Sequence, residues 1–393
     1  MMKKVVVIGG GFVGLQEAIL FAKNGFDVLI IDVDPFVVKH INSGQPHLSE
    51  KYVVENWNKV RDRIAASTSY SSIQEADIVV IAVNTPVKVY GGALVKGLLN
   101  ETEIDYFIDF SPLETAVKEL VRYLWSGTYI NSLVTIYPSG TQERIIKHLD
   151  EAGFVVGRDV YVTHTPERID PGSTRYNPEN IPRNIGYLDE ASLRIGLEVY
   201  KRLGIKLYPE KMHLVELSKL HENAFRLVNI AFVQESLAKF GEDIIKVIDL
   251  ASTKPFGFMR FYPSPYAGGT CLVKDSIMYW YATKNELVKQ ALIINEQMPR
   301  KYAELLYVKI KEKGYKRILF YGLGYKPGSP HYIKKELNPI ERLVEELRSI
   351  DPSLEVKKFD PNIPQHSDFK DEKEAKEWAD IVIYWDYKRL LEV

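Results

Sequence analysis

The fold is decided near the start of the chain by the stretch KVVVIGGGFVG (residues 4–14). Residues 4–8 form a β-branched run typical of a buried strand, and residues 15–24 have helical periodicity. The glycines between them predict a strand, a tight turn and a helix in direct succession. An apolar run at residues 27–31 predicts the next strand. This part of the chain is therefore expected to form the first βαβ unit of a parallel sheet.

The spacing of these glycines indicates a dinucleotide site. In such a turn the first glycine allows the sharp bend, the second lets a pyrophosphate approach the backbone, and the third lets the helix pack closely. Asp32 ends the second strand, where a carboxylate accepts ribose hydroxyls and repels a 2′-phosphate, so NAD is favoured over NADP. The alternative is a purely structural turn. The predicted cofactor-binding residues are Gly9, Gly11, Phe12, Val13, Gly14, Asp32, Thr85 and Pro86.

Composition limits the class of protein. A chain of 393 residues, 46% hydrophobic and 26% charged, is expected to form two or three globular domains. The sequence contains no apolar run of the ~20 residues that a membrane span needs, and a cytoplasmic location is expected. The single cysteine agrees with a reducing compartment. The net charge of -1 gives no general attraction to nucleic acid or to an anionic membrane, and no His/Cys cluster has metal-ligand spacing.

Further α/β units are expected downstream of the first one. Strands are predicted at residues 76–83, 104–110, 129–136 and 159–163, with a helix at 113–124. The carboxyl ends of parallel strands face the ligand side of a doubly wound sheet. Polar residues after these strands are therefore candidates for a common site, although each alone is as consistent with a helix cap or a turn. They are Thr85, Thr135, Glu167 and Arg168.

The pattern changes to a long helix at residues 212–238, followed by a shorter one at 242–250. Within the long helix a polar row shares one face, and a charged row by itself favours a solvated surface over the wall of a site. The row consists of Glu216, Lys219, Asn223 and Arg226. The last third returns to α/β, with strands at 317–321, 354–359 and 380–385 and a helix at 339–349. These predict a second, smaller sheet.

The only cysteine lies in GGTCLVKD (residues 268–275). A glycine pair precedes Cys271, and Lys274 and Asp275 are its nearest ionisable neighbours. A thiolate is a nucleophile, and nearby positive charge or a helix N-terminus favours it. The residues themselves leave a nucleophile and a buried structural thiol about equally supported.

Four motifs together resemble the UDP-glucose/GDP-mannose dehydrogenase family, whose members oxidise the C6 alcohol of a nucleotide sugar with NAD. The motifs are ELSKLHENAFRLVNIA (216–231), GGTCLVKD (268–275), NEQMP (295–299) and GLGYKP (322–327). The resemblance implies an α/β fold of two Rossmann-like doubly wound sheet domains joined by a long central helix. It implies an NAD-binding domain at residues 1–205, a central helical domain with the catalytic loop at 206–300 and a UDP-binding domain at 301–393.

The resemblance also implies roles for individual residues. Cys271 matches the family's nucleophile, which holds the aldehyde as a thiohemiacetal and then as a thioester. The other implied catalytic residues are Lys219, Asn223, Asp275, Glu167 and Thr135. The implied substrate-binding residues are Arg168, Arg226, Tyr262, Tyr266, Gly268, Lys326 and Lys335. A homodimer through the central helix is expected as well, because the helix carries apolar residues beyond one stripe: Leu214, Leu217, Val228, Phe232 and Val233.

The choice of sugar rests on two conflicting motifs. PERIDPG (166–172) is similar to the branch acting on UDP-N-acetylglucosamine or UDP-N-acetylmannosamine, whereas Lys274 is similar to the UDP-glucose branch. A UDP-N-acetylhexosamine is favoured, with UDP-glucose as the alternative. The loop PSPYA (263–267) and the segment GSPHYIKKELNP (328–339), which lacks the family's arginine, depart from the pattern. A two-electron dehydrogenase and a nucleotide-binding protein without turnover therefore also remain open.

Overall fold

The computed structural model describes residues 2–169, 173 and 175–392. The chain divides into two compact units, each with its own apolar core. Unit 1 comprises residues 1–86 and 109–220, and unit 2 comprises residues 87–108 and 221–393. Residues 87–108 thus group with the C-terminal part of the chain, although in sequence they interrupt unit 1.

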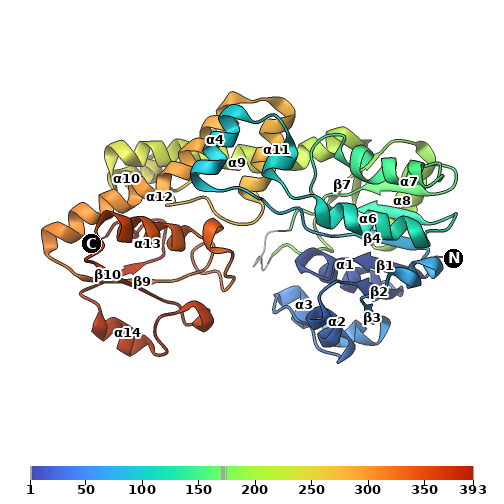
Figure 1. Cartoon of the computed structure of the whole chain (residues 1–393), viewed down its shortest axis with the longest axis horizontal. Helices are drawn as coiled ribbons and strands as arrows, with labels where there is room; N and C mark the ends of the chain where they lie inside the picture. Colours follow the sequence, from blue (N-terminus) through green and yellow to red (C-terminus); the bar gives the residue numbers. More distant parts are fainter. Residues whose placement is uncertain (1, 170–172, 174, 393) are drawn as a thin grey trace. The chain divides into compact units, whose positions relative to one another are not determined.

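Unit 1 is built on a sheet with the strand order β3-β2-β1-β4-β5-β6-β7-β8 (Figure 1). The neighbouring strands pair in parallel apart from β6 and β7, which are antiparallel. Strands β1 and β4 lie in the middle and are apolar runs, as expected of strands covered on both faces. The strands are β1 (Lys4–Ile8), β2 (Asp27–Ile31), β3 (Ile64–Ser67), β4 (Ile78–Ile81), β5 (Tyr129–Ser132), β6 (Tyr161–His164), β7 (Arg183–Tyr187) and β8 (Leu207–Lys211).

Helices cover both faces of this sheet. Strand order reverses between β1 and β4, so right-handed crossovers place α1 and α6 on opposite sides of the sheet. Gly11 precedes the first residue of α1, whereas Asp34 and Asp189 cap α2 and α8 with their side chains. The helices of unit 1 are α1 (Phe12–Lys23), α2 (Pro35–Asn42), α3 (Lys51–Val60), α6 (Ser111–Tyr123), α7 (Lys147–Glu151) and α8 (Glu190–Arg202).

Unit 2 contains a smaller parallel sheet of order β10-β9-β11, made by β9 (Arg317–Tyr321), β10 (Glu355–Phe359) and β11 (Ile381–Tyr384). One core joins this sheet to α12, α13 and the end of α9. The helices of unit 2 are α4 (Gly91–Asn100), α5 (Ile104–Phe107), α10 (Asp243–Ala251), α11 (Leu272–Thr283), α12 (Glu286–Lys313), α13 (Pro339–Ile350) and α14 (Glu372–Trp378).

The long helix α9 (Met212–Phe240) belongs to both units, since residues up to Leu220 group with unit 1 and residues from His221 group with unit 2. Its start coincides with the predicted start of the long helix at residue 212. Lys219 and Asn223 lie one turn apart on this continuous helix, so they project from the same face.

One predicted strand is wrong, and three strands of the large sheet were not predicted. The strand expected at residues 104–110 is the short helix α5 of unit 2, because Ile104 and Phe107 are buried at the three-residue spacing of a helical turn. Strands β3, β7 and β8 were not predicted. Strand β8 lies at the edge of the sheet, is largely exposed and contains Pro209, so it lacks the apolar pattern of a central strand.

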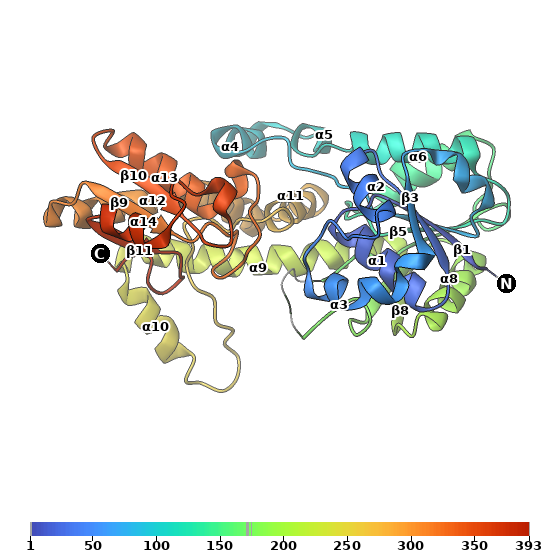
Figure 2. The same cartoon turned by 90° about the horizontal axis from the view of Figure 1, so that it is seen from below.

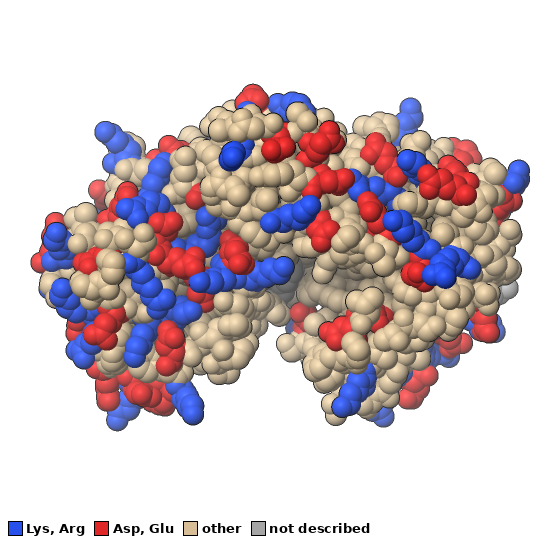
Figure 3. All heavy atoms as spheres, viewed as in Figure 1, with Lys and Arg blue, Asp and Glu red and all other residues tan. Residues whose placement is uncertain are grey.

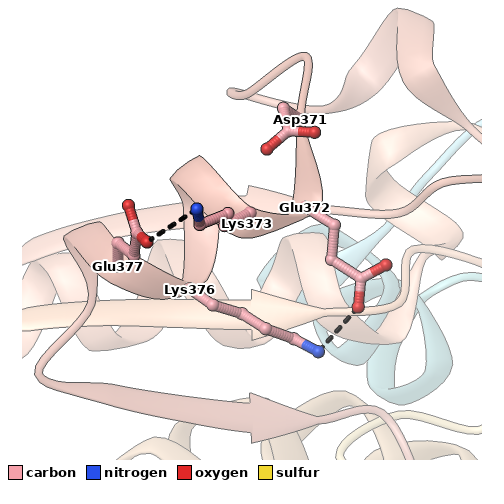
Figure 4. Close-up of a pocket in the computed structure, with 5 residues that line it drawn as sticks. All are labelled: Asp371, Glu372, Lys373, Lys376 and Glu377. Atoms are coloured by element: carbon pink, nitrogen blue, oxygen red, sulfur yellow. Dashed lines mark hydrogen bonds and ion pairs between the residues drawn. The ribbon is translucent and has the colours of Figure 1, made fainter.

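The surface carries both signs of charge. Figure 3 shows Lys and Arg interspersed with Asp and Glu over the face seen in Figure 1, in keeping with the net charge of -1. No helix in the described part of the chain is long and apolar enough to cross a membrane. Figure 4 shows a surface depression beside α14 in which Lys376 pairs with Glu372 at 2.6 Å. Its lining charges pair with one another along one short exposed helix, which is a solvated helix face.

Candidate active site

The turn between β1 and α1 requires its glycines. Gly9 has φ +97°, and a Cβ there would lie 2.7 Å from the Ala82 carbonyl oxygen. A Cβ on Gly14 would lie 1.8 Å from the Gly9 oxygen, so only glycine allows this helix to pack so closely. A Cβ on Gly11 would meet nothing within 4 Å, which leaves open space beside the backbone at the N-terminus of α1. These are the three roles that the sequence predicts for the glycines of a dinucleotide turn.

Asp32 holds the same turn from the end of β2. Its Oδ2 accepts a hydrogen bond of 2.6 Å from the Gly10 N–H, and its Oδ1 accepts one of 2.8 Å from the Asp34 N–H. Each carboxylate oxygen can accept a second bond, so the group remains able to receive ribose hydroxyls. Phe12 and Val13 open α1, whose N-terminal N–H groups suit an anionic pyrophosphate. The site therefore fits a dinucleotide.

Thr85 and Pro86 follow β4 in the same unit. The buried Thr85 hydroxyl donates to the Thr135 carbonyl oxygen at 3.2 Å, and this bond joins the segments that follow β4 and β5. The Pro86 carbonyl accepts from the Asp109 N–H at 2.8 Å. Thr85 and Thr135 are thus neighbours, as expected of residues after adjacent parallel strands.

Glu167 follows β6 and is held from two directions. Its Oε1 accepts hydrogen bonds from the N–H groups of Arg168 at 2.6 Å and Ile169 at 2.9 Å. Its Oε2 lies 3.5 Å from Nη2 of Arg183, a fully enclosed side chain of β7. The remainder of the PERIDPG motif, residues 170–172, lies outside the described residues.

The segment after β5 is tied to α9 by Glu216. This buried carboxylate accepts the N–H groups of Ser139 at 2.6 Å and Thr141 at 2.9 Å. Burial raises the pKa of Glu216 to about 7, although these hydrogen bonds act in the opposite direction. Ser139 is held with φ +70°, an uncommon conformation for a residue other than glycine. The polar face of α9 is therefore partly buried, and Lys219 lies one turn after Glu216 on it.

Cys271 is exposed and lies immediately before α11, whose N-terminal end favours negative charge. The Thr270 hydroxyl lies 3.7 Å from its sulfur. Asp275 is fully buried one turn further on and accepts a hydrogen bond of 2.6 Å from Nδ2 of Asn223. Nζ of Lys274 lies 3.9 Å from the other carboxylate oxygen. In unit 2 the structure thus brings together three of the predicted catalytic residues, Cys271, Asn223 and Asp275.

The glycine pair before the cysteine packs against the C-terminal sheet region of unit 2. A Cβ on Gly268 would lie 2.2 Å from the Leu337 carbonyl oxygen. Gly269 has φ +99°, and a Cβ there would lie 3.5 Å from the Tyr325 ring. The GLGYKP motif, which contains Tyr325, and the catalytic loop are therefore neighbours, and neither glycine can be replaced without strain.

Tyr266 has a different setting from that expected of a substrate contact. Its ring is fully buried, and its hydroxyl donates to Oε1 of Glu296 at 2.8 Å. The Arg342 guanidinium lies 4.1 Å from the ring centroid and also pairs with Glu296 at 2.8 Å. This network anchors the PSPYA loop, which departs from the family pattern, to α12 and α13. The structure thus places Tyr266 in the core of unit 2.

The other predicted substrate-binding residues are spread over unit 2, with Arg168 in unit 1. Arg226 is exposed on α9. The Tyr262 hydroxyl donates to Oδ1 of Asp249 at 2.7 Å, and Lys335 is exposed and paired with Glu345. Nζ of Lys326 lies 5.5 Å from the ring centroid of its neighbour Tyr325. Their contact with a nucleotide sugar stays a prediction.

Sequence reasoning missed two buried charged residues of unit 1, Glu17 and Arg183. Arg183 makes two hydrogen bonds to Glu17, of 2.9 and 2.8 Å, from positions 166 residues apart. The available signal was Glu17 itself, a charged residue within the otherwise apolar helix VGLQEAILFA (13–22). Such a residue predicts a buried opposite charge but cannot say where in the chain that partner lies.

The fold and the glycine turn define a dinucleotide-binding protein of the Rossmann type, and comparison with known proteins gives the family. Residues 3–204 match the NAD-binding domain of the UDP-glucose/GDP-mannose dehydrogenase family, and residues 214–297 match its central domain. The chain therefore belongs to this family and is an NAD-dependent nucleotide-sugar dehydrogenase. The predictions of the family, of the enzyme class, of NAD and of two Rossmann-like domains are confirmed.

Three similar proteins illustrate the relationship. The UDP-N-acetyl-D-mannosamine dehydrogenase of Methanocaldococcus jannaschii is 30% identical over 367 residues, covering 91% of this chain and 79% of that protein. The structure of the UDP-D-ManNAc dehydrogenase of Pyrococcus horikoshii is similar with a TM-score of 0.83 at 27% identity, covering 97% and 88% of the two chains. The structure of a UDP-glucose dehydrogenase from Pyrobaculum islandicum has a TM-score of 0.77 at 25% identity, covering 98% and 90%.

Proposed function

We propose that this dehydrogenase oxidises the C6 hydroxyl of a UDP-N-acetylhexosamine to a carboxylate through a covalent intermediate on Cys271. The observation that carries the proposal is the setting of the thiol. Cys271 is exposed before the first turn of α11, and the buried Asp275, one turn on, is hydrogen-bonded to Asn223. A cysteine with a purely structural role would have no need of this exposure, whereas a nucleophile requires it.

Four electrons leave the substrate, so the aldehyde formed midway has to be held on the enzyme. After the alcohol loses a hydride and a proton, the sulfur of Cys271 forms a C–S bond to the aldehyde carbon and the thiol proton passes to the carbonyl oxygen, which gives a thiohemiacetal. Loss of a second hydride and a proton leaves a thioester. Water then breaks the C–S bond and releases the carboxylate, the thiol and a proton. The Gly9–Gly14 turn and Asp32 would hold NAD⁺, which would supply the hydride acceptor for both oxidations.

Negative charge develops on the C6 oxygen in both oxidations, which calls for donors fixed in advance. Lys219 and Asn223 supply an ammonium group and an amide from successive turns of α9. Asp275 orients the Asn223 amide through their 2.6 Å hydrogen bond and is suited to orient a water that takes the alcohol proton.

Hydrolysis of the thioester needs a base for the attacking water, and we assign this role to Glu167, with Thr135 as a helper. The support is geometric. Two backbone N–H groups hold Oε1 of Glu167, while among the described residues Oε2 contacts Arg183 at the longer ion-pair distance of 3.5 Å. A carboxylate fixed in this way retains an oxygen that can accept a proton from water.

UDP-N-acetyl-D-mannosamine is the first substrate to test, because the similar proteins from P. horikoshii and M. jannaschii are named UDP-N-acetyl-D-mannosamine dehydrogenase. The Pro166-Glu167-Arg168 sequence supports the same branch, since it places an arginine in the loop expected to face the sugar. UDP-glucose is the alternative, favoured by Lys274 beside Asp275 and by the similarity to the P. islandicum structure.

The decisive experiment measures NADH formed per sugar consumed for UDP-N-acetylmannosamine, UDP-N-acetylglucosamine and UDP-glucose. Two NADH and one uronic acid per UDP-N-acetylmannosamine, with a higher kcat/KM than for the other two sugars, are expected. A ratio of one would mean a two-electron dehydrogenase and would remove the need for a covalent intermediate. A higher kcat/KM for UDP-glucose would instead reassign the substrate and leave the mechanism standing.

The proposal also assigns a separate binding or catalytic role to each of three parts of the chain. Residues 1–205 bind NAD, residues 206–300 carry the catalytic cysteine, and residues 301–393 bind the UDP part of the substrate. The packing of Gly268 on Leu337 and of Gly269 near Tyr325 supports the last assignment, since it brings the C-terminal loops next to the catalytic loop within unit 2.

Two copies of the chain are proposed to associate through α9 and α10. Figure 2 shows α10 and the segment after it on the other side of α9 from the β9–β11 sheet, while Ile244 and Ile248 of α10 join the core of unit 2. Large apolar side chains are exposed there, and such exposure in a soluble protein indicates a partner surface. A two-fold axis would pair this surface with itself. The large apolar side chains of this surface that are at least 62% exposed are Phe232, Phe240, Leu250, Phe256 and Met259.

A further inference from the structure

The buried ion pair between Arg183 and Glu17 is next to Glu167 in unit 1, since Arg183 also contacts Glu167. Arg183 and Glu17 are only 2% and 1% exposed at their side chains. The guanidinium gives both of its short hydrogen bonds to Glu17, at 2.9 and 2.8 Å, and reaches Glu167 only at 3.5 Å. One buried cation is therefore shared unequally between two carboxylates.

We propose that Arg183 is a positioning residue for Glu167, and that Glu17 sets how strongly Arg183 acts on it. The inference rests on the proposed role of Glu167 in thioester hydrolysis. A guanidinium bonded in the bidentate manner to Glu167 would hold it as a permanent ion pair and make it a weak base. Because Glu17 takes both hydrogen bonds, Arg183 keeps Glu167 in place by charge without occupying its Oε2.

The three residues come from three different elements of the sheet. Glu17 lies on α1, Arg183 begins β7 and Glu167 follows β6. Their contacts are fixed by the sheet, since β7 pairs with β6 directly. Burial raises the pKa of Glu17, while the charge of Arg183 acts in the opposite direction. Because one guanidinium faces two carboxylates, a change in the charge of Glu17 alters how strongly Arg183 acts on Glu167.

The surroundings of the pair contain several other ionisable groups. The Tyr200 hydroxyl lies 3.4 Å from Oε1 of Glu17 and 3.5 Å from Nη1 of Arg183. Burial raises the pKa of Tyr52, Tyr129 and Tyr200, so these three hydroxyls stay neutral between pH 6 and 9. In the described part of the chain, the other ionisable groups around the network are Tyr200 on α8, Tyr129 on β5, Tyr52 on α3, Glu179 bonded to Tyr52, Lys23 paired with Glu179, and Arg168 beside Glu167.

The test is the variant Glu17→Gln in the full-length enzyme. It keeps the shape of the side chain and leaves Arg183 facing one carboxylate, Glu167, so the buried cation keeps a partner and the fold is expected to be retained. Arg183 is then expected to bond Glu167 more strongly. The acid limb of the kcat profile should move to lower pH by about one unit, with a reduced maximal rate and an unchanged KM for NAD. Glu17→Asp, which restores a carboxylate, should move the acid limb back.

Two controls separate this inference from the function on which it rests. Glu167→Gln should accumulate the Cys271 thioester, detected as a mass increase on the protein after mixing with NAD and the UDP-sugar. If that variant accumulates nothing, the role of Glu167 is wrong and the inference falls with it. If it traps the thioester while Glu17→Gln keeps the wild-type acid limb, only the inference is overturned. A lowered Tm of Glu17→Gln with no shift of the acid limb would likewise reduce the pair to a structural role.

Discussion

Nδ2 of Asn223 donates a 2.6 Å hydrogen bond to Oδ2 of Asp275, which joins α9 to α11 four residues after Cys271. Asp275 has no exposed surface, so its carboxylate depends on protein groups for the hydrogen bonds that water would otherwise supply. The bond therefore couples the position of a buried carboxylate to the helix that also carries Lys219.

Asn223→Ala removes this donor and is expected to lower the free energy of unfolding by about 1–3 kcal/mol, the cost of a lost partner for a buried charged group. The value of kcat should fall as well, because the amide is proposed to stabilise the C6 oxygen. Thermal unfolding and steady-state kinetics measure the two effects. The matched control is Asn229→Ala on the same helix, whose side chain bonds the Phe225 carbonyl within its own helix. Equal effects of the two substitutions would contradict a special role for Asn223.

Cys271→Ser should lower the rate of uronic acid formation by about two orders of magnitude or more, because a hydroxyl is a poor nucleophile and cannot form the thioester. Binding of NAD and of the nucleotide sugar should persist, since the exposed thiol contacts only Thr270 among the interactions described. Product analysis and ligand titration measure these outcomes. Uronic acid formed at the wild-type rate would make the cysteine structural.

Asp32→Ala is expected to raise the KM for NAD by about 10- to 100-fold, which corresponds to losing hydrogen bonds from ribose hydroxyls to a charged group. The KM for the sugar should change little. Asp34→Ala is the matched control, because Asp34 caps α2 two residues away through its bond to the Phe36 N–H. An equal rise in both KM values for Asp32→Ala would indicate misfolding instead of a lost cofactor contact.

Glu216 should make stability depend on pH. The fold raises its pKa from 4.5 to about 7, so its stabilising contribution is complete below about pH 4.5 and is lost as the pH rises through 7. At ~1.4 kcal/mol per pKa unit, the loss is on the order of 3 kcal/mol. The difference in Tm between wild type and Glu216→Gln should therefore fall from pH 5 to pH 8. Glu222→Gln, an exposed position on the same helix, should leave that pH dependence unchanged.

The parts of the fold that sequence predicted are those set by local pattern. Strand β9 was predicted to the residue, because RILFY (317–321) is an apolar run bounded by a glycine turn. Strand β7 was missed, because its sequence RNIGY contains an arginine whose partner, Glu17, lies 166 positions away. A contact so distant in sequence has no local signal.

The candidate site likewise has features that local sequence predicted and features that it did not. The glycine turn and Asp32 were predictable, because backbone geometry demands glycine at fixed spacings. The burial of Tyr266 was not, because its hydroxyl partner Glu296 and the Arg342 above its ring come from separate helices. Similarly, Val233 was expected on the dimer surface, but it is 6% exposed and packs in the core of unit 2.

The proposed dimer surface is tested by Phe232→Glu and Leu250→Glu, whose side chains are both 71% exposed on α9 and α10. A charge placed on an apolar surface that meets its own copy brings two like charges together and removes buried apolar area. Each variant should therefore sediment as a smaller species than wild type at micromolar concentration, with an unchanged Tm for the monomer core.

The control for that surface is Leu287→Glu, which is 70% exposed on α12 and lies outside the proposed surface. It should sediment as wild type does, because an exposed leucine that contacts no partner can be replaced by a charged residue without loss of buried area. If wild type is already a monomer while fully active, the dimer proposal is wrong. If Leu287→Glu dissociates the protein and Phe232→Glu does not, the interface lies near the start of α12 instead of on α9 and α10.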